Sequence, residues 1–368
     1  MKISCLKNDL EKALLAAQKL ASKNLNLPIL ENTLFEARGD ELFVKATNIE
    51  LFLEYKITIS LEKDGDFAIA TDILLQSIKS SKDNKKIDLE QKGNLVHVND
   101  GNSSFSIKTV SGEDFPKIKK PEELKDTKNT INKDVLINGI KAVQAYSSNL
   151  IIKPELASIY IYKDDEDLVF VATDHFRLAE KRIKFKKDTE FKDILLPVKN
   201  ANSLVKILES VDDEEFRFVN KENQLSLESE KLFVSSRILD LNFPDYKVII
   251  PKKYSTKLIL LKNDLAEALR NTAIFTDKFS KIEFSLEDEK LKIKAQNQDI
   301  GEIRKNLDIK KEGEDSFSLN LNNRFLQESL SSINSDTVEI WYTDEKSPIL
   351  IKGLSDSSFI YILMPMNK

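Results

Sequence analysis

The chain has 368 residues, 41% of them hydrophobic, which is enough for two or three domains with buried cores. No stretch approaches the roughly 18 consecutive apolar residues of a transmembrane helix, and the first residues lack a leader pattern, so we expect a cytoplasmic protein without a membrane span. One cysteine and two histidines exclude an internal disulfide, a cysteine-clustered metal site and a histidine-based one, and we predict no cofactor. The net charge of −5 argues only weakly against nucleic acid as a partner, because it does not say where the charges lie.

The first predicted element is a helix over 6–23. Leu10, Leu14 and Ala17 recur there at helical spacing, and we expect this apolar face to pack on a sheet. Two strands around a charged turn follow at 34–48, where apolar and polar residues alternate. A second helix is predicted at 69–81. Helix, strands and helix together form one unit of the chain.

The same series returns twice. Residues 6–14 read LKNDLEKAL, residues 261–269 read LKNDLAEAL, and a looser copy, INKDVLINGIKAV, occupies 131–143. The second helices of the later copies are predicted at 196–211 and 319–333. Self-similarity of this kind marks repeated domains, so the chain holds three copies of one domain of roughly 120 residues.

Short signatures keep the same register. The strand pairs end in ATN at 46–48, ATD at 172–174 and AQN at 295–297. A further signature, DFP at 114–116, returns as NFPDY at 242–246. Because independent landmarks share one spacing, coincidence does not explain the repeat.

We therefore predict an α+β fold of three repeated domains, in which two helices per domain cover one face of antiparallel sheets. The predicted domains span 1–126, 127–253 and 254–368, and the charged, proline-containing segments 119–129 and 251–257 are the expected linkers. Each copy opens its first helix with an acidic residue that favours the positive end of the helix dipole. These residues are Asp9, Asp134 and Asp264.

Lysines gather on the helix faces opposite the apolar stripes. Residues 7–23 carry four lysines against two acidic residues, and 73–86 carry four against one. A solvated, lysine-rich side is common on any helix, and this is the alternative explanation. However, these helices occupy equivalent places in a repeated unit, so a closed arrangement of the units would direct all of them to one surface. A basic surface on an acidic chain suits phosphate binding without sequence preference, since no base-reading motif accompanies it. The residues expected to face DNA are Lys12, Lys19, Lys23, Lys79, Lys82, Lys141, Lys199, Lys206 and Arg270.

Five strings spread over the whole chain read NLPILENTL at 26–34, ATDHFRLAEKR at 172–182, NFPDYKVIIP at 242–251, SPILIK at 347–352 and YILMPMNK at 361–368. They resemble the bacterial DNA polymerase III beta subunit family, the sliding clamps. The resemblance implies a ring-shaped, head-to-tail homodimer of DNA-clamp domains, with helices lining the hole and antiparallel sheets outside. Such a ring encircles duplex DNA, tethers the replicative polymerase and has no active site of its own. The implied partners are double-stranded DNA, the polymerase III alpha subunit, the clamp loader and other proteins that carry a clamp-binding motif.

The resemblance also implies a groove that captures short peptides from these partners. Its apolar lining suits a leucine or aromatic anchor. The implied groove residues are Lys153, Leu156, Thr173, His175, Phe176, Arg177, Leu178, Pro244, Val248, Ile362, Leu363, Met364, Pro365 and Met366. Lys153 and Asn367 stand where the family often has arginine, and Val248 replaces a basic residue, so the groove differs at its polar rim. Alternatively, the residues of the tail are not part of a groove and simply form a terminal strand of the core.

For the dimer seam, the resemblance points to Phe105 and Ile107 of the first domain, which would meet Ile274 and Phe275 of the third. Alternatively, each of these four residues is an ordinary core residue without a role in the dimer.

Two other functions stay open. A DNA-free scaffold of three repeated domains would display peptide grooves alone. An enzyme would use Asp174 and His175, but the chain has no nucleophile motif and no phosphate loop beside them, so we rank catalysis last and predict that the protein is not an enzyme.

Overall fold

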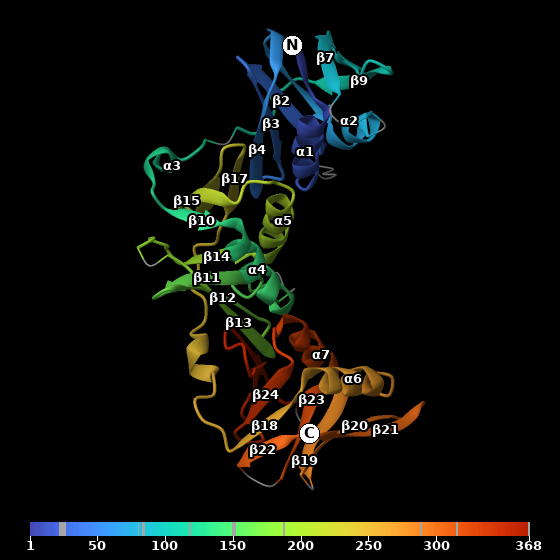
Figure 1. Ribbon diagram of the computed structural model, residues 1–368, viewed down its shortest axis with the longest axis vertical. Coiled ribbons are helices and arrows are strands. Elements are labelled where there is room, and N and C mark those ends of the chain that lie inside the picture. Colours follow the sequence, from blue (N-terminus) through green and yellow to red (C-terminus); the bar gives the residue numbers. More distant parts are fainter. Residues whose placement is uncertain are drawn as a thin grey trace. The chain divides into compact units, whose positions relative to one another are not determined.

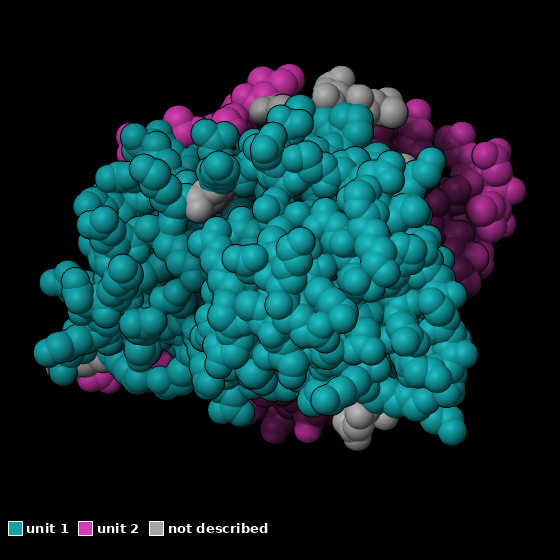
Figure 2. Space-filling view, turned by 90° about the horizontal axis from the view of Figure 1, so that it is seen from above, with its two compact units in different colours: residues 1–138, 186–240 teal, residues 139–185, 241–368 magenta. Residues whose placement is uncertain are grey.

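The structure is a computed structural model that describes residues 1–21, 27–79, 81–82, 85–117, 119–148, 152–186, 188–287, 289–313 and 316–366. Lys23 and Asn367 lie outside the described residues. The chain forms two compact units (Figure 2): the first holds residues 1–138 and 186–240, and the second holds residues 139–185 and 241–368.

The first unit contains all the described strands of the first repeat and part of the second repeat. Its strands are β1 (Lys2–Leu6), β2 (Asn32–Arg38), β3 (Glu41–Thr47), β4 (Leu51–Thr58), β5 (Ser60–Lys63), β6 (Gly65–Ala70), β7 (Lys86–Lys92), β8 (Leu95–Asn99), β9 (Ser104–Val110), β10 (Thr130–Asn132), β14 (Ile194–Pro197), β15 (Glu215–Lys221), β16 (Gln224–Glu228) and β17 (Leu232–Arg237). Its helical segments are α1 (Lys7–Gln18), η1 (Pro28–Glu31), α2 (Thr71–Ile78), α3 (Glu123–Asp126) and α5 (Val198–Glu209). Helix α4 (Lys133–Val143) begins in the first unit and ends in the second (Figure 1).

One antiparallel sheet of thirteen strands runs through the first unit, in the order β10-β15-β16-β17-β4-β3-β2-β6-β9-β8-β7-β1-β5. At its centre Leu51–Tyr55 of β4 pairs with Leu232–Ser236 of β17, so the sheet joins the first and second repeats. Helix α1 packs on β3 and β4 and buries Leu10, Leu14 and Ala17, as the helical spacing predicts (Figure 1).

The second unit contains the rest of the second repeat and all of the third. Its strands are β11 (Ser158–Asp164), β12 (Asp167–Thr173), β13 (Arg177–Lys184), β18 (Thr256–Leu261), β19 (Lys281–Glu287), β20 (Lys290–Asn297), β21 (Gly301–Asp308), β22 (Lys310–Gly313), β23 (Phe317–Asn322), β24 (Thr337–Tyr342), β25 (Ile349–Gly353) and β26 (Phe359–Leu363). Its other helical segments are η2 (Gln144–Tyr146), η3 (Tyr246–Ile249), α6 (Lys262–Ala273) and α7 (Asn323–Ser332).

The large sheet of the second unit runs β11-β12-β13-β26-β25-β24-β18-β22, and a smaller sheet runs β21-β20-β19-β23. The pairing of β13 with β26 again joins two repeats, with Arg177 opposite Leu363 and Leu178 opposite Ile362. Successive residues of a strand point to opposite faces of the sheet. These two pairs therefore lie on opposite faces, which decides what each can contact.

Each predicted helix is present and is shorter than its sequence pattern. The predicted helix over 6–23 ends at Gln18. After Gln18 the α-helical hydrogen-bond pattern changes to a tighter turn: the amides of Lys19 and Leu20 donate to carbonyls three residues earlier, on Ala16 and Ala17. Within the described ranges, no helix combines the length and hydropathy that crossing a bilayer requires.

Candidate functional site

The candidate groove starts at the tight turn between β12 and β13. The Thr173 hydroxyl donates to the Arg177 carbonyl at 2.7 Å, and the Asp174 carboxylate accepts from the amides of Phe176 and Arg177 at 3.1 Å. His175 takes a φ of 78°, so its side chain leaves the strand direction. The turn consequently presents His175 and Phe176 to solvent, with Phe176 64% exposed.

Arg177 leaves the same turn toward the opposite side of the sheet. Its guanidinium donates to Asp174 at 2.8 Å, to Glu328 of α7 and to the Ala145 carbonyl at 3.1 Å. The ring of Phe325 lies 4.1 Å from the guanidinium carbon. Burial alone would lower the pKa of Arg177, but the bonds to Glu328 and Asp174 outweigh it and raise that pKa. Arg177 is therefore a buried cation that ties the turn to α7.

Leu178 and Ile362 lie side by side on the other face, both buried, at the position predicted for the floor of the groove. They belong to a buried cluster with Tyr162, Val169, Val171, Tyr246 and Leu350, and Tyr160, Phe243, Ile250 and Trp341 pack against it. Leu363 is fully buried and, being opposite Arg177, faces away from this floor. The predicted groove residues thus divide between two faces of the sheet.

A second wall comes from the chain around η3. Pro244 is exposed, Val248 is 73% exposed, and Tyr246 between them is buried in the floor cluster. Ile249 is exposed beside Val248. The sequence analysis passed over Ile249, although the apolar run of residues 248–250 was a signal that could have identified it.

The C-terminal tail crosses from the groove to β23. The Met364 amide donates to the Phe176 carbonyl at 2.8 Å, and the Met366 amide donates to the Asn320 carbonyl at 2.8 Å. A cavity of about 290 Å³ opens beside it. The cavity is lined by Ser318, Leu319, Asn320, Glu345, Lys346, Met364, Pro365 and Met366. The tail therefore contributes backbone bonds to the unit as well as apolar side chains to this cavity.

Lys153 and Leu156 lie at the far end of the turn. The Lys153 ammonium is 3.3 Å from Nε2 of His175, and because an ammonium can only donate, Nε2 accepts. Leu156 is buried, and its carbonyl accepts from the Ser148 amide. Lys153 thus supplies a positive charge at the rim, whereas Leu156 belongs to the core below it.

The cations expected to face DNA are distributed over both units. Lys19, Lys79, Lys82, Lys199 and Lys206 are exposed in the first unit, and Lys141 and Arg270 are exposed in the second. Lys12 forms an ion pair with Asp212, so this lysine is already partly neutralised. The exposed side chains could each contact phosphate.

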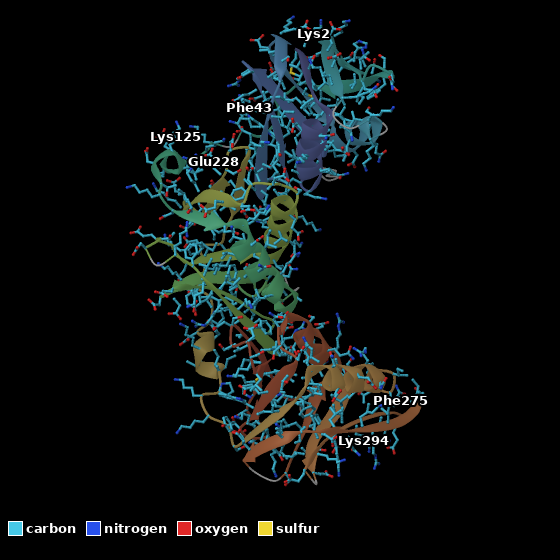
Figure 3. All side chains as sticks on the ribbon, in the orientation of Figure 1. Lys2, Phe43, Lys125, Glu228, Phe275 and Lys294 are labelled. Carbon is cyan, nitrogen blue, oxygen red and sulfur yellow. The ribbon has the colours of Figure 1, made fainter. Side chains whose placement is uncertain are left out.

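The open strand edges of the described residues include those of β9 and β21. Within the described residues, Ser104–Lys108 of β9 pairs only with β8, and β21 pairs only with β20. Ile107 is buried and Phe105 is half-buried, whereas Ile274, at the end of α6, is 66% exposed and Phe275 beside it is half-buried (Figure 3). Of the predicted seam residues, Ile274 and Phe275 of the third repeat thus present apolar surface. Phe105 and Ile107 of the first repeat belong to β9, which has an open edge.

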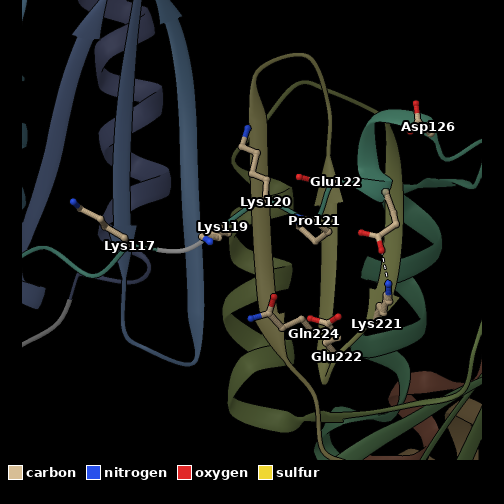
Figure 4. Close-up of a pocket in the computed structure, with 10 residues that line it drawn as sticks. Lys117, Lys119, Lys120, Pro121, Glu122, Asp126, Lys221, Glu222 and Gln224 are labelled. Atoms are coloured by element: carbon tan, nitrogen blue, oxygen red, sulfur yellow. Dashed lines mark hydrogen bonds and ion pairs between the residues drawn. The ribbon is translucent and has the colours of Figure 1, made fainter.

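A larger cavity, about 730 Å³, lies in the first unit along the predicted linker (Figure 4). Its lining is mostly charged and includes Lys119, Lys120, Glu122 and Lys221, the last ion-paired with Glu123. Because opposite charges alternate there without an apolar floor, the cavity does not resemble a peptide-anchoring groove. No group of three or more metal-ligating side chains occurs in the part of the chain that the structure describes.

Models of the DNA polymerase III beta subunit match almost the whole chain: the N-terminal domain at residues 1–119, the central domain at 130–245 and the C-terminal domain at 247–367. The beta sliding clamp of Vibrio cholerae is 26% identical over 368 residues, with 100% of both chains covered. A crystal structure of the Pseudomonas aeruginosa DNA polymerase III subunit beta superposes with a TM-score of 0.92 at 22% identity, and covers 100% of both chains. A second structure, of the same organism's sliding clamp bound to griselimycin, matches equally, with a TM-score of 0.92.

These matches confirm the resemblance and the α+β fold of repeated clamp domains. The family is the processivity factor of DNA polymerase III, a subunit that performs no catalysis. The chain belongs to the DNA polymerase III beta subunit family, the bacterial sliding clamps.

Proposed function

We propose that the protein is a DNA sliding clamp: a homodimeric ring that encircles duplex DNA in the cytoplasm and tethers the replicative polymerase to it. The observation that carries the proposal is the threefold clamp domain, matched from residue 1 to residue 367. We place the three domains at 1–126, 127–253 and 254–368. A closed ring is retained on DNA by its topology, so its contacts with DNA need not be strong.

Contact with DNA is proposed for the exposed cations of the helices. Lys206 in α5 and Arg270 in α6 lie in the last turns of their helices, where no base-reading element accompanies them. Such contacts go to phosphates and weaken with salt, without sequence preference. Weak contacts of this kind let a ring slide.

The open edges of β9 and β21 support the homodimer. A strand with unpaired N–H and C=O groups is a template for pairing with another chain. Because β9 belongs to the first repeat and β21 to the third, a head-to-tail pairing of two copies would satisfy both edges. Ile274 and Phe275 would then be covered by Phe105 and Ile107 of the other copy.

The groove of the second unit is the proposed docking site for partner peptides, including those of the polymerase III alpha subunit and the clamp loader. The exposed Phe176, Val248 and Ile249 offer apolar surface to a leucine or aromatic anchor above the buried Leu178 and Ile362, and the tail supplies adaptable methionines. Lys153 and His175 mark a polar rim. Griselimycin, bound to the clamp of Pseudomonas aeruginosa, is a ready probe for this groove.

The deciding experiment is retention on circular DNA. A ring loaded on a nicked circle stays bound in high salt and is lost when the circle is cut, because it slides off the ends. A DNA-free scaffold shows no retention on either form. The solution mass provides a second measurement: a ring requires a value near twice 42.0 kDa at low micromolar concentration, and a monomeric mass contradicts it.

A further inference from the structure

The wall of the groove around η3 is attached to the second unit by side chains. No backbone–backbone hydrogen bond joins residues 241–254 to other described residues of the unit, and near the end of this segment the Lys253 carbonyl accepts from the Thr343 hydroxyl at 3.1 Å. Phe243 stacks on Tyr160 of β11 with ring centroids 5.0 Å apart, and Lys247 lies over the ring of Tyr162 at 4.9 Å. The Lys247 ammonium also lies 3.9 Å from the Asp164 carboxylate. Phe243 is half-buried and Lys247 is exposed, so a buried directional contact is needed to fix the wall in place.

Tyr246 supplies that contact. It is the one buried residue of 241–254, and its hydroxyl donates to Glu180 of β13. Because a carboxylate only accepts, Tyr162 in turn donates to the Tyr246 oxygen, at 2.7 Å. Arg182 donates to the other carboxylate oxygen of Glu180 at 2.7 Å. Burial and the neighbouring Glu180 raise the pKa of Tyr246, so its hydroxyl keeps the proton that it donates.

The position of Tyr246 links this network to the groove. Its ring belongs to the floor cluster with Leu178 and Ile362. Pro244 stands two residues before it and Val248 two residues after it, both exposed. A shift of the η3 backbone that carries Tyr246 would move both wall residues relative to a floor that the sheet holds fixed.

We propose that Tyr246 is a positioning residue for peptide binding, and that its hydrogen bond to Glu180 sets the width of the groove between the η3 wall and the Leu178–Ile362 floor. This inference rests on the proposed function, because it concerns the same groove. Tyr246 touches the floor and carries the wall, so it acts on the peptide through Pro244 and Val248.

The test compares two substitutions that each delete one hydroxyl from the same network, Tyr246→Phe and Tyr162→Phe. The full-length protein is titrated with a fluorescein-labelled peptide ending in Leu-Phe, and the emission of Trp341, the one tryptophan of the chain, is followed as a second signal because it packs against the floor cluster. We expect Tyr246→Phe to weaken peptide binding about tenfold, the range for losing a hydrogen bond to a charged group. Tyr162→Phe leaves the bond between Tyr246 and Glu180 in place and should stay within about twofold of the wild type.

Tyr246→Phe removes the bonds to Glu180 and to Tyr162, whereas Tyr162→Phe removes the second of these alone, so Tyr246→Phe should lower the unfolding midpoint further. The affinities are therefore compared at a temperature at which both variants are folded. Equal affinities for the two variants, whether both weak or both normal, would overturn the inference. Should Tyr246→Phe fail to fold, Glu180→Gln, which keeps the shape but offers Tyr246 a neutral acceptor, must weaken binding more than Tyr162→Phe. A wild-type protein that does not bind the peptide refutes the groove itself, which is a different result.

Discussion

The turn that ends β3 and the turn that ends β12 have the same backbone and different side chains. In the first, the Thr47 hydroxyl donates to the Leu51 carbonyl at 2.6 Å and Asn48 accepts from the Glu50 and Leu51 amides. Thr173 and Asp174 make the equivalent bonds in the second. Ile49 and His175 both take a φ of 78°. The signatures ATN and ATD therefore specify one turn, built twice.

The three residues after each signature differ. Leu51 of the first turn is equivalent to Arg177 of the second: Leu51 is buried, whereas Arg177 binds Glu328 of α7. Glu50 is equivalent to Phe176, which is exposed. Each turn lies beside a junction of two repeats, β4 with β17 and β13 with β26. The signature therefore sets the backbone of the turn, and the side chains that follow it determine which contacts the turn makes at its junction.

The largest expected effect comes from giving the second turn the side chain of the first. Arg177→Leu leaves Asp174 half-buried without its cation and leaves Glu328 with the exposed Arg324 alone, and should destabilise the second unit by about 3 kcal/mol. Urea unfolding followed by Trp341 fluorescence measures this loss. Arg324→Leu is the control: Arg324 binds the same Glu328 but is 76% exposed, and should cost little. A loss for Arg177→Leu no larger than that of the control would show that the two junctions are energetically alike.

Phe176→Ala should weaken binding of a peptide ending in Leu-Phe about tenfold, the range for an exposed aromatic anchor of an interface. The matched change in the first turn, Glu50→Ala, should leave affinity unchanged. Fluorescence anisotropy of the labelled peptide measures both. If both variants bind equally, the groove does not lie at the second turn.

Glycine at the positive-φ position should stabilise both turns, because a side chain there costs about 1 kcal/mol. We expect a larger gain for Ile49→Gly than for His175→Gly, since a β-branched residue is the less tolerant of this conformation. Thermal unfolding midpoints test the order. Ile73→Gly, at an exposed isoleucine inside α2, should lower the midpoint and serves as the opposite control.

The smallest expected effect is a loss of stability at low pH that arises at the junction of β13 with β26 and not at that of β4 with β17. Burial would raise the pKa of Glu328, but its bonds to Arg177 and Arg324 prevail and lower that pKa below the ordinary 4.5. A lowered folded-state pKa contributes stability above 4.5 that is lost as the pH falls through the folded value. Glu328→Gln should therefore flatten the stability profile of the protein below pH 4.5. An unchanged profile would mean that Glu328 titrates alike in the folded and unfolded states.

The sequence predicted the repeat and the helices, because these depend on local periodicity and short motifs. The residues of the groove turn were implied by the family resemblance, and their role in peptide binding stays a prediction. The sequence did not predict the partner of Arg177, since Glu328 lies 151 positions away and nothing local marks it. Because side chains alternate along a strand, the sequence alone shows that neighbouring residues such as Leu178 and Arg177 point to opposite faces of the sheet. It does not show which residue of β26 lies opposite Arg177, and this pairing register puts Leu363 on the face away from Leu178.

The pairing of β4 with β17 has a mechanical consequence. Its hydrogen bonds lie perpendicular to the strands, so a pull along the strands loads every pair from Leu51 to Tyr55 at once. A pull across the sheet separates the same pairs one after another. The junction is accordingly stiff toward one direction of force and compliant toward the other.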